Sequence, residues 1–139
     1  MTHYRTALRA ETEAILKSDA LFANATLVLS SAKVDCETVP CWSISTPSED
    51  REDLNGRQFR ADTDLVVALK VKGDAASIED ELDDHAEKIE TLLTEGLEQN
   101  TGVQSVLLRR TEIKTGLEAK HIIGSVMMLF VVTGFIQDV

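Results

Sequence analysis

The longest uncharged run of the chain is IIGSVMMLFVVTGF, over residues 122–135. A membrane-spanning helix needs about 20 apolar residues, so this shorter run predicts no membrane span. Its Ile and Val residues favour a pleated strand. Alternation places Ile122, Val126, Met128, Phe130 and Val132 on one face, and Ile123, Met127, Leu129, Val131 and Phe135 on the other. Because both faces are apolar, the strand is expected to need cover on both sides.

Two further segments show helical periodicity. Residues 2–18 carry apolar side chains at intervals of three and four, which predicts an amphipathic helix. A second helix is expected to begin at Ser77, where residues 77–80 resemble a capping box. Its predicted end lies at Gly96 and residues 100–102. The expected buried stripe of the second helix contains Ile78, Leu82, His85 or Ala86, Ile89, Leu92 and Leu93.

Four more segments predict strands, over residues 24–31, 41–46, 57–72 and 103–116. In the third, Leu65, Val67, Leu69 and Val71 share one face, whereas Asp64, Val66, Ala68, Lys70 and Lys72 share the other, which indicates a half-buried strand. Residues 47–57 hold four carboxylates and two arginines and end in the turn dipeptide Asn55-Gly56, which predicts a mobile charged loop. The glycines at predicted breaks are interpreted as turn residues: Gly56, Gly73, Gly96, Gly102 and Gly116.

The resulting order, α-β-β-β-α-β-β, predicts one α+β domain over residues 1–139. We expect a mostly antiparallel, mixed five-stranded sheet with two helices packed on one face. Two helices cannot cover both faces, and an uncovered apolar face usually marks contact with another chain. Self-association in a ring or dimer is therefore expected. The candidate contact residues on the last strand and its neighbour are Leu108, Met127, Leu129 and Val131, with burial inside the monomer as the competing interpretation.

Charge narrows the classes of partner. The formal net charge is −10, and residues 74–98 hold ten carboxylates against a single cation, Lys88. Nucleic-acid-binding domains usually carry a basic excess, so no specific nucleic-acid binding is expected. The N-terminal MTHYRTALRAETEAILK lacks the apolar core and cleavage site of a signal peptide, and the protein is expected to stay where it is made.

Candidate chemistry is sparse. Glu81 and His85 lie at i, i+4 on the acidic helix, but two groups from one helix seldom complete a metal site, so no metal and no cofactor are predicted. Cys36 and Cys41 flank Pro40, which favours reduced thiols over a bridge across a turn or a metal site. Neither a glycine-framed nucleophile nor a phosphate-binding loop is present, so no catalytic residue is assigned and no enzyme is predicted.

Several strings resemble one protein family over nearly the whole chain. They are RTALRAETEAILK, PCWSISTP, DLVVALKVKG, IEDELDDHAEKIETLL, the short TEI strand and the terminal apolar strand. In this order they resemble the tail terminator proteins of long-tailed bacteriophages, the lambda minor tail protein U-like group. The chain departs from that group in the dense acidity of its second helix and in its Met-rich last strand.

The resemblance implies a structural role in the virion, without a catalytic residue or a cofactor. Members of the family form a hexameric ring on the finished tail tube, stop its polymerisation and offer the surface that joins the filled head. The implied partners are sister copies, the tail tube protein and a head-completion or neck protein. The implied location is the head–tail junction of the virion, after synthesis in the host bacterial cytoplasm.

Two charged segments supply candidate contacts for these partners. The loop from Ser48 to Arg60 is long for a hairpin connection, and we expect its Arg51, Arg57 and Arg60 to face the tail tube or its lumen. Asp83, Asp84 and Glu87 of the acidic helix are candidates for contact with a basic head or neck protein. The alternatives are a head–tail connector, such as a neck or head-closure protein, and a small α+β enzyme or ligand-binding module, which would need a convergent polar pocket.

Overall fold

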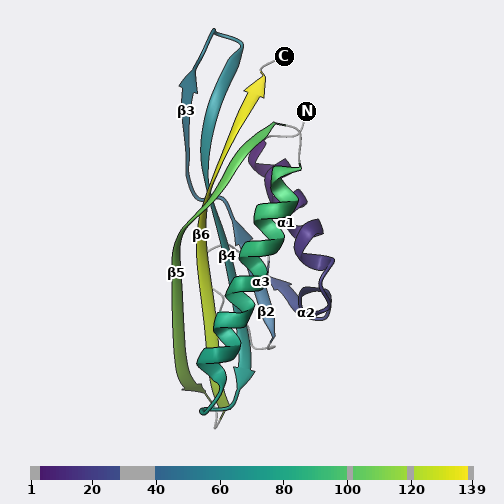
Figure 1. Cartoon of the computed structure of the whole chain (residues 1–139), viewed down its shortest axis with the longest axis vertical. Coiled ribbons are helices and arrows are strands. Elements are labelled where there is room, and N and C mark those ends of the chain that lie inside the picture. The colour runs from purple at the N-terminus through teal and green to yellow at the C-terminus, as the bar shows by residue number, and fades with distance from the viewer. Residues whose placement is uncertain (1–3, 29–39, 100–101, 119–120, 138–139) are drawn as a thin grey trace.

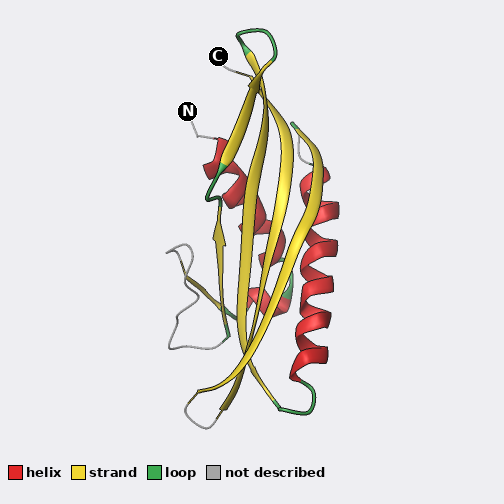
Figure 2. Cartoon of the chain, turned by 90° about the vertical axis from the view of Figure 1, so that its left-hand side faces the viewer, coloured by secondary structure: helices red, strands yellow, loops and turns green. Residues whose placement is uncertain are grey.

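The computed structural model describes residues 4–28, 40–99, 102–118 and 121–137. In these residues the chain forms an α+β structure in which helices cover one face of a long, twisted sheet (Figures 1 and 2). The helices are α1 (Tyr4–Lys17), α2 (Ala20–Ala23) and α3 (Ile78–Glu98). The strands are β1 (Thr26–Val28), β2 (Cys41–Ser45), β3 (Glu49–Asp53), β4 (Gln58–Gly73), β5 (Val103–Glu118) and β6 (His121–Gln137).

The sheet has the order β1-β2-β4-β6-β5, and β3 pairs with β4 beside this path. The pairing of β1 with β2 is parallel, and the other pairings are antiparallel. The predicted fold class, α+β with a mostly antiparallel, mixed sheet, is therefore confirmed. The predicted number of elements is too small, because the described residues contain six strands and three helices rather than five and two.

The additional strand, β3, lies where a mobile loop was expected. It pairs with residues 59–63 of β4, on the same side of β4 as β2, which pairs with residues 66–70. The Asn55 side chain accepts hydrogen bonds from the backbone N–H groups of Arg57, at 3.1 Å, and Gln58, at 2.8 Å, and Gly56 has a φ of +80°. The loop prediction was wrong because β4 continues past the end of β2 and offers an edge on which β3 can pair.

The core lies between the helices and the covered face of the sheet. The apolar residues of α3 recur with helical spacing, and Ile78, Leu82, Ile89, Leu93 and Leu97 are buried. Opposite them, β4 and β6 contribute alternate residues. Phe22 of α2 packs edge-on against Trp42 of β2, with ring centroids 5.1 Å apart. Burial of each large apolar side chain contributes about 1.5–3 kcal/mol, so this layer provides most of the stabilisation.

Two local predictions about α3 were wrong. Ser77 forms no capping hydrogen bond to the helix backbone, and its hydroxyl donates instead to the Glu81 carboxylate at 3.2 Å. Gly96 lies inside the helix rather than at a turn. A Cβ on Gly96 would lie 2.8 Å from Cδ1 of Ile15, so the glycine allows α1 and α3 to approach closely. Gly116 likewise lies within a strand, β5, whereas β4 ends at Gly73 as the predicted break requires.

Two further points concern the cysteines and the membrane prediction. Cys41 is disulfide-bonded, so the expectation of a reduced thiol at this position was wrong. Cys36, and residues 29–31 of the strand predicted at residues 24–31, lie outside the described residues. Among the described helices, none has the length and apolar character needed to cross a membrane.

A candidate interaction surface

The two faces of β6 differ in their cover. Val126, Met128, Phe130 and Val132 are buried beneath the helices, whereas Met127 on the other face is 41% exposed. Leu129 and Val131 share the face of Met127 and are half-buried. The alternation predicted for this strand is confirmed, and the second face has no helix over it in the described part of the chain. We call this second side of the sheet the open face.

Two neighbouring leucines of β5, Leu107 and Leu108, lie on opposite faces of the sheet. Leu107 pairs with Val131 and is 59% exposed on the open face. Leu108 pairs with Phe130 and packs against the core, so its predicted place on the exposed face was wrong. The register shifts between Leu108 and Arg110, and beyond this irregularity Arg110 pairs with Leu129. A sequence with two adjacent leucines gives no signal that separates them, because the register of β5 against β6 decides which one faces outward.

A hollow of about 350 Å³ lies on the open face. Its walls come from β2, β4, β5 and β6, and combine serine hydroxyls with charged and apolar groups. Lys70 is 8% exposed, and Glu112 and Lys114 line the rim contributed by β5. No group of three or more His, Cys, Asp or Glu side chains converges in the described residues. The hollow therefore offers polar and apolar contacts to a chain packed against it.

The three candidate arginines all lie on the hairpin formed by β3 and β4, which we call the arm. The arm extends beyond the end of β2 (Figure 1). Arg51 bonds to Glu49, with 2.6 Å between Nε and Oε2, and lies 5.8 Å from the ring centre of Phe59. Arg57 is exposed in the turn. Arg60 forms an ion pair with Asp62, with 3.8 Å between Nε and Oδ1. The structure thus brings these residues together, with Arg57 and Arg60 accessible at the outer part of the arm.

The base of the arm is anchored to α1. The Tyr4 hydroxyl lies 2.5 Å from the place that a Cβ would take at Gly134, so the glycine makes room for the tyrosine ring. Burial, followed by the nearby carboxylate of Glu49, raises the pKa of Tyr4 above its ordinary value, and the phenol stays protonated at neutral pH. Arg9 of α1 donates to the Thr46 hydroxyl at 2.5 Å. These contacts fix the direction in which the arm projects.

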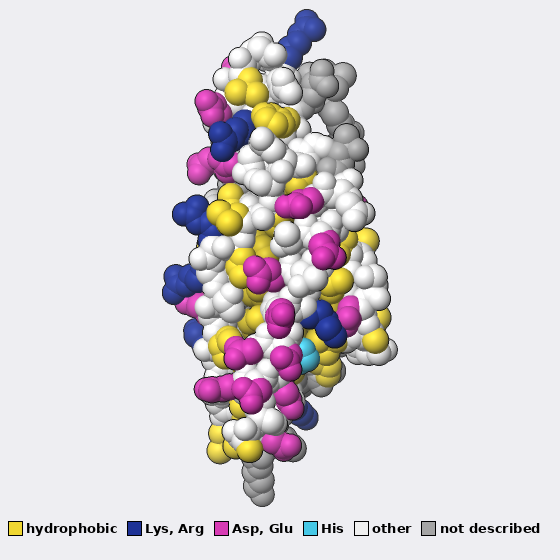
Figure 3. All heavy atoms as spheres, in the orientation of Figure 1, with side chains coloured by type: hydrophobic (Ala, Val, Ile, Leu, Met, Phe, Trp, Pro, Cys, Tyr) yellow, Lys and Arg dark blue, Asp and Glu magenta, His cyan; other side chains and the backbone are white. Residues whose placement is uncertain are grey.

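The outer side of α3 is strongly acidic. Asp83, Asp84 and Glu87 are exposed there, and Figure 3 shows carboxylates along the length of this helix. His85 lies between them, and its pKa is lowered by burial and by Lys88, against the opposing effect of nearby carboxylates. Lys88 forms an ion pair with Asp19 rather than with the three candidate carboxylates, with 3.3 Å between Nζ and Oδ2. The three candidate carboxylates therefore form one accessible surface, on the side of the sheet opposite to the open face.

Comparison with known proteins identifies a similar fold. No family model matches the chain, and no curated protein matches it. Among solved structures, the chain is similar to one chain in a structure described as "Virion of native gene transfer agent (GTA) particle". The TM-score is 0.62 at 14% sequence identity, and the match covers 96% of this chain and 99% of the other. At this identity the likeness concerns the fold, which the two chains share over almost their whole lengths.

Proposed function

We propose that this protein is a structural subunit of a phage-like virion, which caps the tail tube, ends its polymerisation and provides the surface for head joining. The fold shared at nearly full length with a chain of a gene transfer agent virion carries the proposal. A sheet covered by helices on one side supports it, because a ring subunit needs free surface for its neighbours. The proposed location is the head–tail junction of the virion, after synthesis in a bacterial cytoplasm.

In the proposed ring, which we expect to be a hexamer, sister copies contact one another around the open face. Met127, Leu129 and Val131 are the proposed contact residues, joined by Leu107, which is the more exposed leucine of β5. Leu108 is not retained as a contact because it packs against the core of its own chain. Covering exposed apolar side chains favours association by about 25 cal/mol for each Å² removed from water.

Different ends and sides of the subunit are proposed to meet the two other partners. The arm, with Arg51, Arg57 and Arg60, contacts the tail tube protein or faces its lumen. The acidic outer side of α3, with Asp83, Asp84 and Glu87, contacts a basic head-completion or neck protein. This division keeps the acidic surface accessible after the ring has formed, since α3 lies on the other side of the sheet from the open face (Figure 2).

Electron microscopy of tails assembled with and without the protein tests this function. Without it, we expect tails of uncontrolled length, because nothing stops addition of tube subunits. Adding back the wild-type protein should restore a uniform length. If tails have normal length without the protein but remain unattached to filled heads, the capping role is wrong and a head–tail connector role is supported in its place.

A further inference from the structure

Beside the arm, the sheet ends in two unpaired edge strands. Its strand order there is β3-β4-β6-β5, so β3 forms one edge and β5 the other. Within the described residues, no strand pairs with the outer side of β3 or of β5. An edge strand exposes N–H and C=O groups that can pair with a strand of another chain. Both edges are therefore available for the addition of a strand.

The two edges carry opposite charge. Four of the five residues of β3 are carboxylates, and its one cation, Arg51, is bonded to Glu49. Three cations, Arg109, Arg110 and Lys114, occur within residues 109–114 of β5. The carboxylate in that stretch, Glu112, is bonded to Arg110. Arg109 and Lys114 make no ion pair in the part of the chain that the structure describes, so they remain available to a partner.

We propose that β3 of one copy pairs with the outer edge of β5 of the next copy, with its carboxylates beside residues 109–114. This inference rests on the proposed ring and adds an edge contact to the contacts proposed around the open face. Two β3 edges would repel each other, and so would two β5 edges, because like charges beside one another in a sheet are destabilising. The charge pattern therefore favours a contact between two different edges, which repeats from copy to copy and can close into a ring.

Strand direction and side-chain face agree with this contact. Successive pairings of β3, β4, β6 and β5 are antiparallel, so β3 and β5 of one copy run in opposite directions. A rotation that preserves strand direction therefore makes the joint between copies antiparallel as well. Every neighbouring pair of strands in the extended sheet, β3-β4-β6-β5 followed by β3 of the next copy, is then antiparallel.

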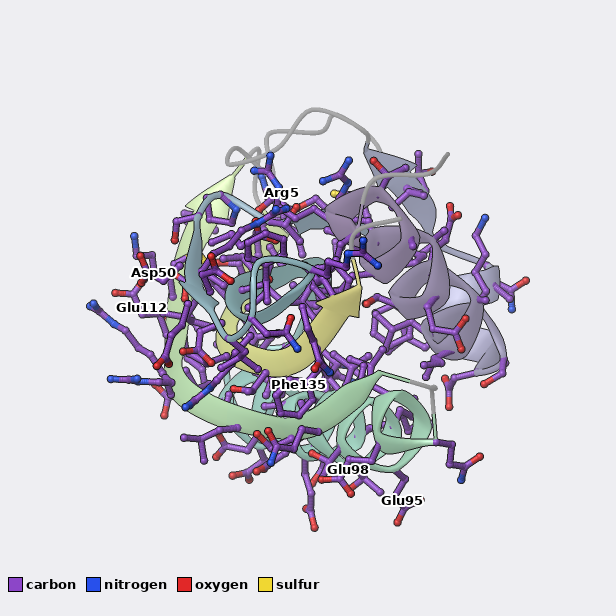
Figure 4. All side chains as sticks on the ribbon, turned by 90° about the horizontal axis from the view of Figure 1, so that it is seen from above. Arg5, Asp50, Glu95, Glu98, Glu112 and Phe135 are labelled. Carbon is purple, nitrogen blue, oxygen red and sulfur yellow. The ribbon has the colours of Figure 1, made fainter. Side chains whose placement is uncertain are left out.

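The charged side chains of the two edges also share a face. Asp50 and Glu52 pair with Asp62 and Arg60 of β4, which point away from the helices. Arg110 and Lys114 pair with residues on the open face of β6. Figure 4 shows Asp50 and Glu112 on one side of the molecule, away from Glu95 and Glu98 of α3. The acidic and basic side chains would therefore meet on the same face of the extended sheet.

The contact requires an offset along the strands. The arm lies level with residues 132–136 of β6, whereas Arg110 lies level with Leu129. Strands that tilt relative to the axis of a closed ring produce a stagger of this kind between neighbours. The exposed Leu107 of β5 would gain a neighbouring strand at the same time.

Charge reversal on each edge tests the proposal. An arm variant carries Asp50→Lys and Glu52→Lys, and an edge variant carries Arg109→Glu and Lys114→Glu. In sedimentation experiments over a wide concentration range, we expect each variant alone to associate at least about tenfold more weakly than the wild type, because like charges would meet at the joint. A protein with all four substitutions should recover association. Its basic β3 would meet an acidic β5 edge, so opposite charges face each other again.

Mixing provides a second readout. Equimolar arm and edge variants should assemble together, because each joint between the two proteins again unites opposite charges. The assemblies should contain the two proteins in alternation and in equal amounts. Native mass spectrometry measures the composition of these mixed assemblies. A contact between identical edges would unite like charges in the wild type and in each variant alone, so it predicts no weakening by either single reversal, and the single variants separate the two arrangements.

Matched controls separate the contact from net charge and from folding. Asp83→Lys with Glu87→Lys changes the net charge as the arm variant does, but on the outer side of α3. Lys17→Glu with Lys88→Glu matches the charge change of the edge variant, on the helices. Both controls should associate like the wild type. Circular dichroism should show native folding in all variants, because the substituted side chains are exposed.

Three results would overturn the proposal: association that neither reversal weakens, no recovery in the fourfold variant and the mixture, or a wild-type protein that stays monomeric at every concentration and on tail tubes. These outcomes are distinguishable from failure of the proposed function, which is measured by tail length. Tails that need the protein for length control, with association indifferent to both reversals, would leave the capping role intact and remove the edge contact.

Discussion

At Gly96 a single missing side chain sets the distance between α1 and α3. A Cβ there would lie within 3.0 Å of three side-chain carbons of Ile15, so rotation about one bond cannot clear it. Gly96→Val should lower the free energy of unfolding by about 1–3 kcal/mol, because overpacking outweighs the gain from replacing a helical glycine. Urea unfolding followed by circular dichroism measures this change.

A matched substitution controls for the loss of glycine itself. A Cβ on Gly116 of β5 would meet nothing within 4 Å, so Gly116→Val should cause no loss of stability. Shortening the opposing side chain with Ile15→Ala should recover part of the loss in Gly96→Val. Equal stability of Gly96→Val and the wild type would show that the two helices can separate without cost.

The sequence predicted which residues are buried where apolar residues recur with a regular spacing. It failed where contacts with another element determine the environment of a residue. The alternation of Leu65, Val67 and Leu69 in β4 was predicted correctly, since it follows from side-chain geometry alone. Gly96 was mistaken for a turn residue because a glycine at a helix end and one at a helix contact look alike in sequence. Leu107 and Leu108 could not be told apart without the register of β5.

Among the elements, the arm shows how a partner strand can override composition. Charged residues make up all of β3, EDRED, and they have low strand propensity, so the segment was predicted to be a loop. Pairing with β4 satisfies its backbone groups on one side, and the Asn55 turn sets the hairpin geometry. The helices, by contrast, were predicted from their own amphipathic periodicity. The candidate arginines were placed on one element by the sequence, but their exposure on a projecting hairpin required the structure.

The arm provides a prediction for the contact with the tail tube. Arg57→Glu with Arg60→Glu should reduce binding to tail tubes by at least about tenfold, because loss of a charged contact across an interface costs about 2–5 kcal/mol. Cosedimentation with purified tubes measures binding, and electron microscopy measures capping. The Lys17→Glu and Lys88→Glu protein has the same charge change away from the arm and should bind normally. Unchanged capping and infectivity in the Arg57→Glu and Arg60→Glu protein would remove these arginines from the proposed tube contact.

For the whole molecule, the distribution of charge matters more than its total. The net charge of −10 comes largely from residues 74–98, whose carboxylates line the outer side of α3. The open face and the edge of β5 instead combine apolar and basic side chains, including Leu107, Met127 and Lys114. The molecule therefore has one repulsive side and one associating side, so copies are expected to orient with α3 outward. The sequence predicted the acidic helix, and the structure showed that it lies opposite to the open face.

This separation predicts that head joining and ring formation can be lost independently. Asp83→Asn, Asp84→Asn and Glu87→Gln together remove three exposed charges of α3 and should weaken head joining by at least about tenfold, by the loss of charged contacts to a basic partner. Ring formation and tail length should not change, because these exposed side chains belong to α3, on the side of the sheet opposite to the open face. In-vitro joining of purified heads and capped tails, counted by electron microscopy, measures the first effect, and sedimentation measures the second.

The same helix supplies the control for that experiment. Glu79→Gln, Asp80→Asn and Glu90→Gln remove three other exposed charges from α3 and leave the three candidate carboxylates in place. If the two triple variants lose head joining equally, the partner responds to the overall charge of the helix rather than to residues 83–87. If either variant loses ring formation together with head joining, the outer side of α3 takes part in assembly, and the assignment of separate sides to separate partners is refuted.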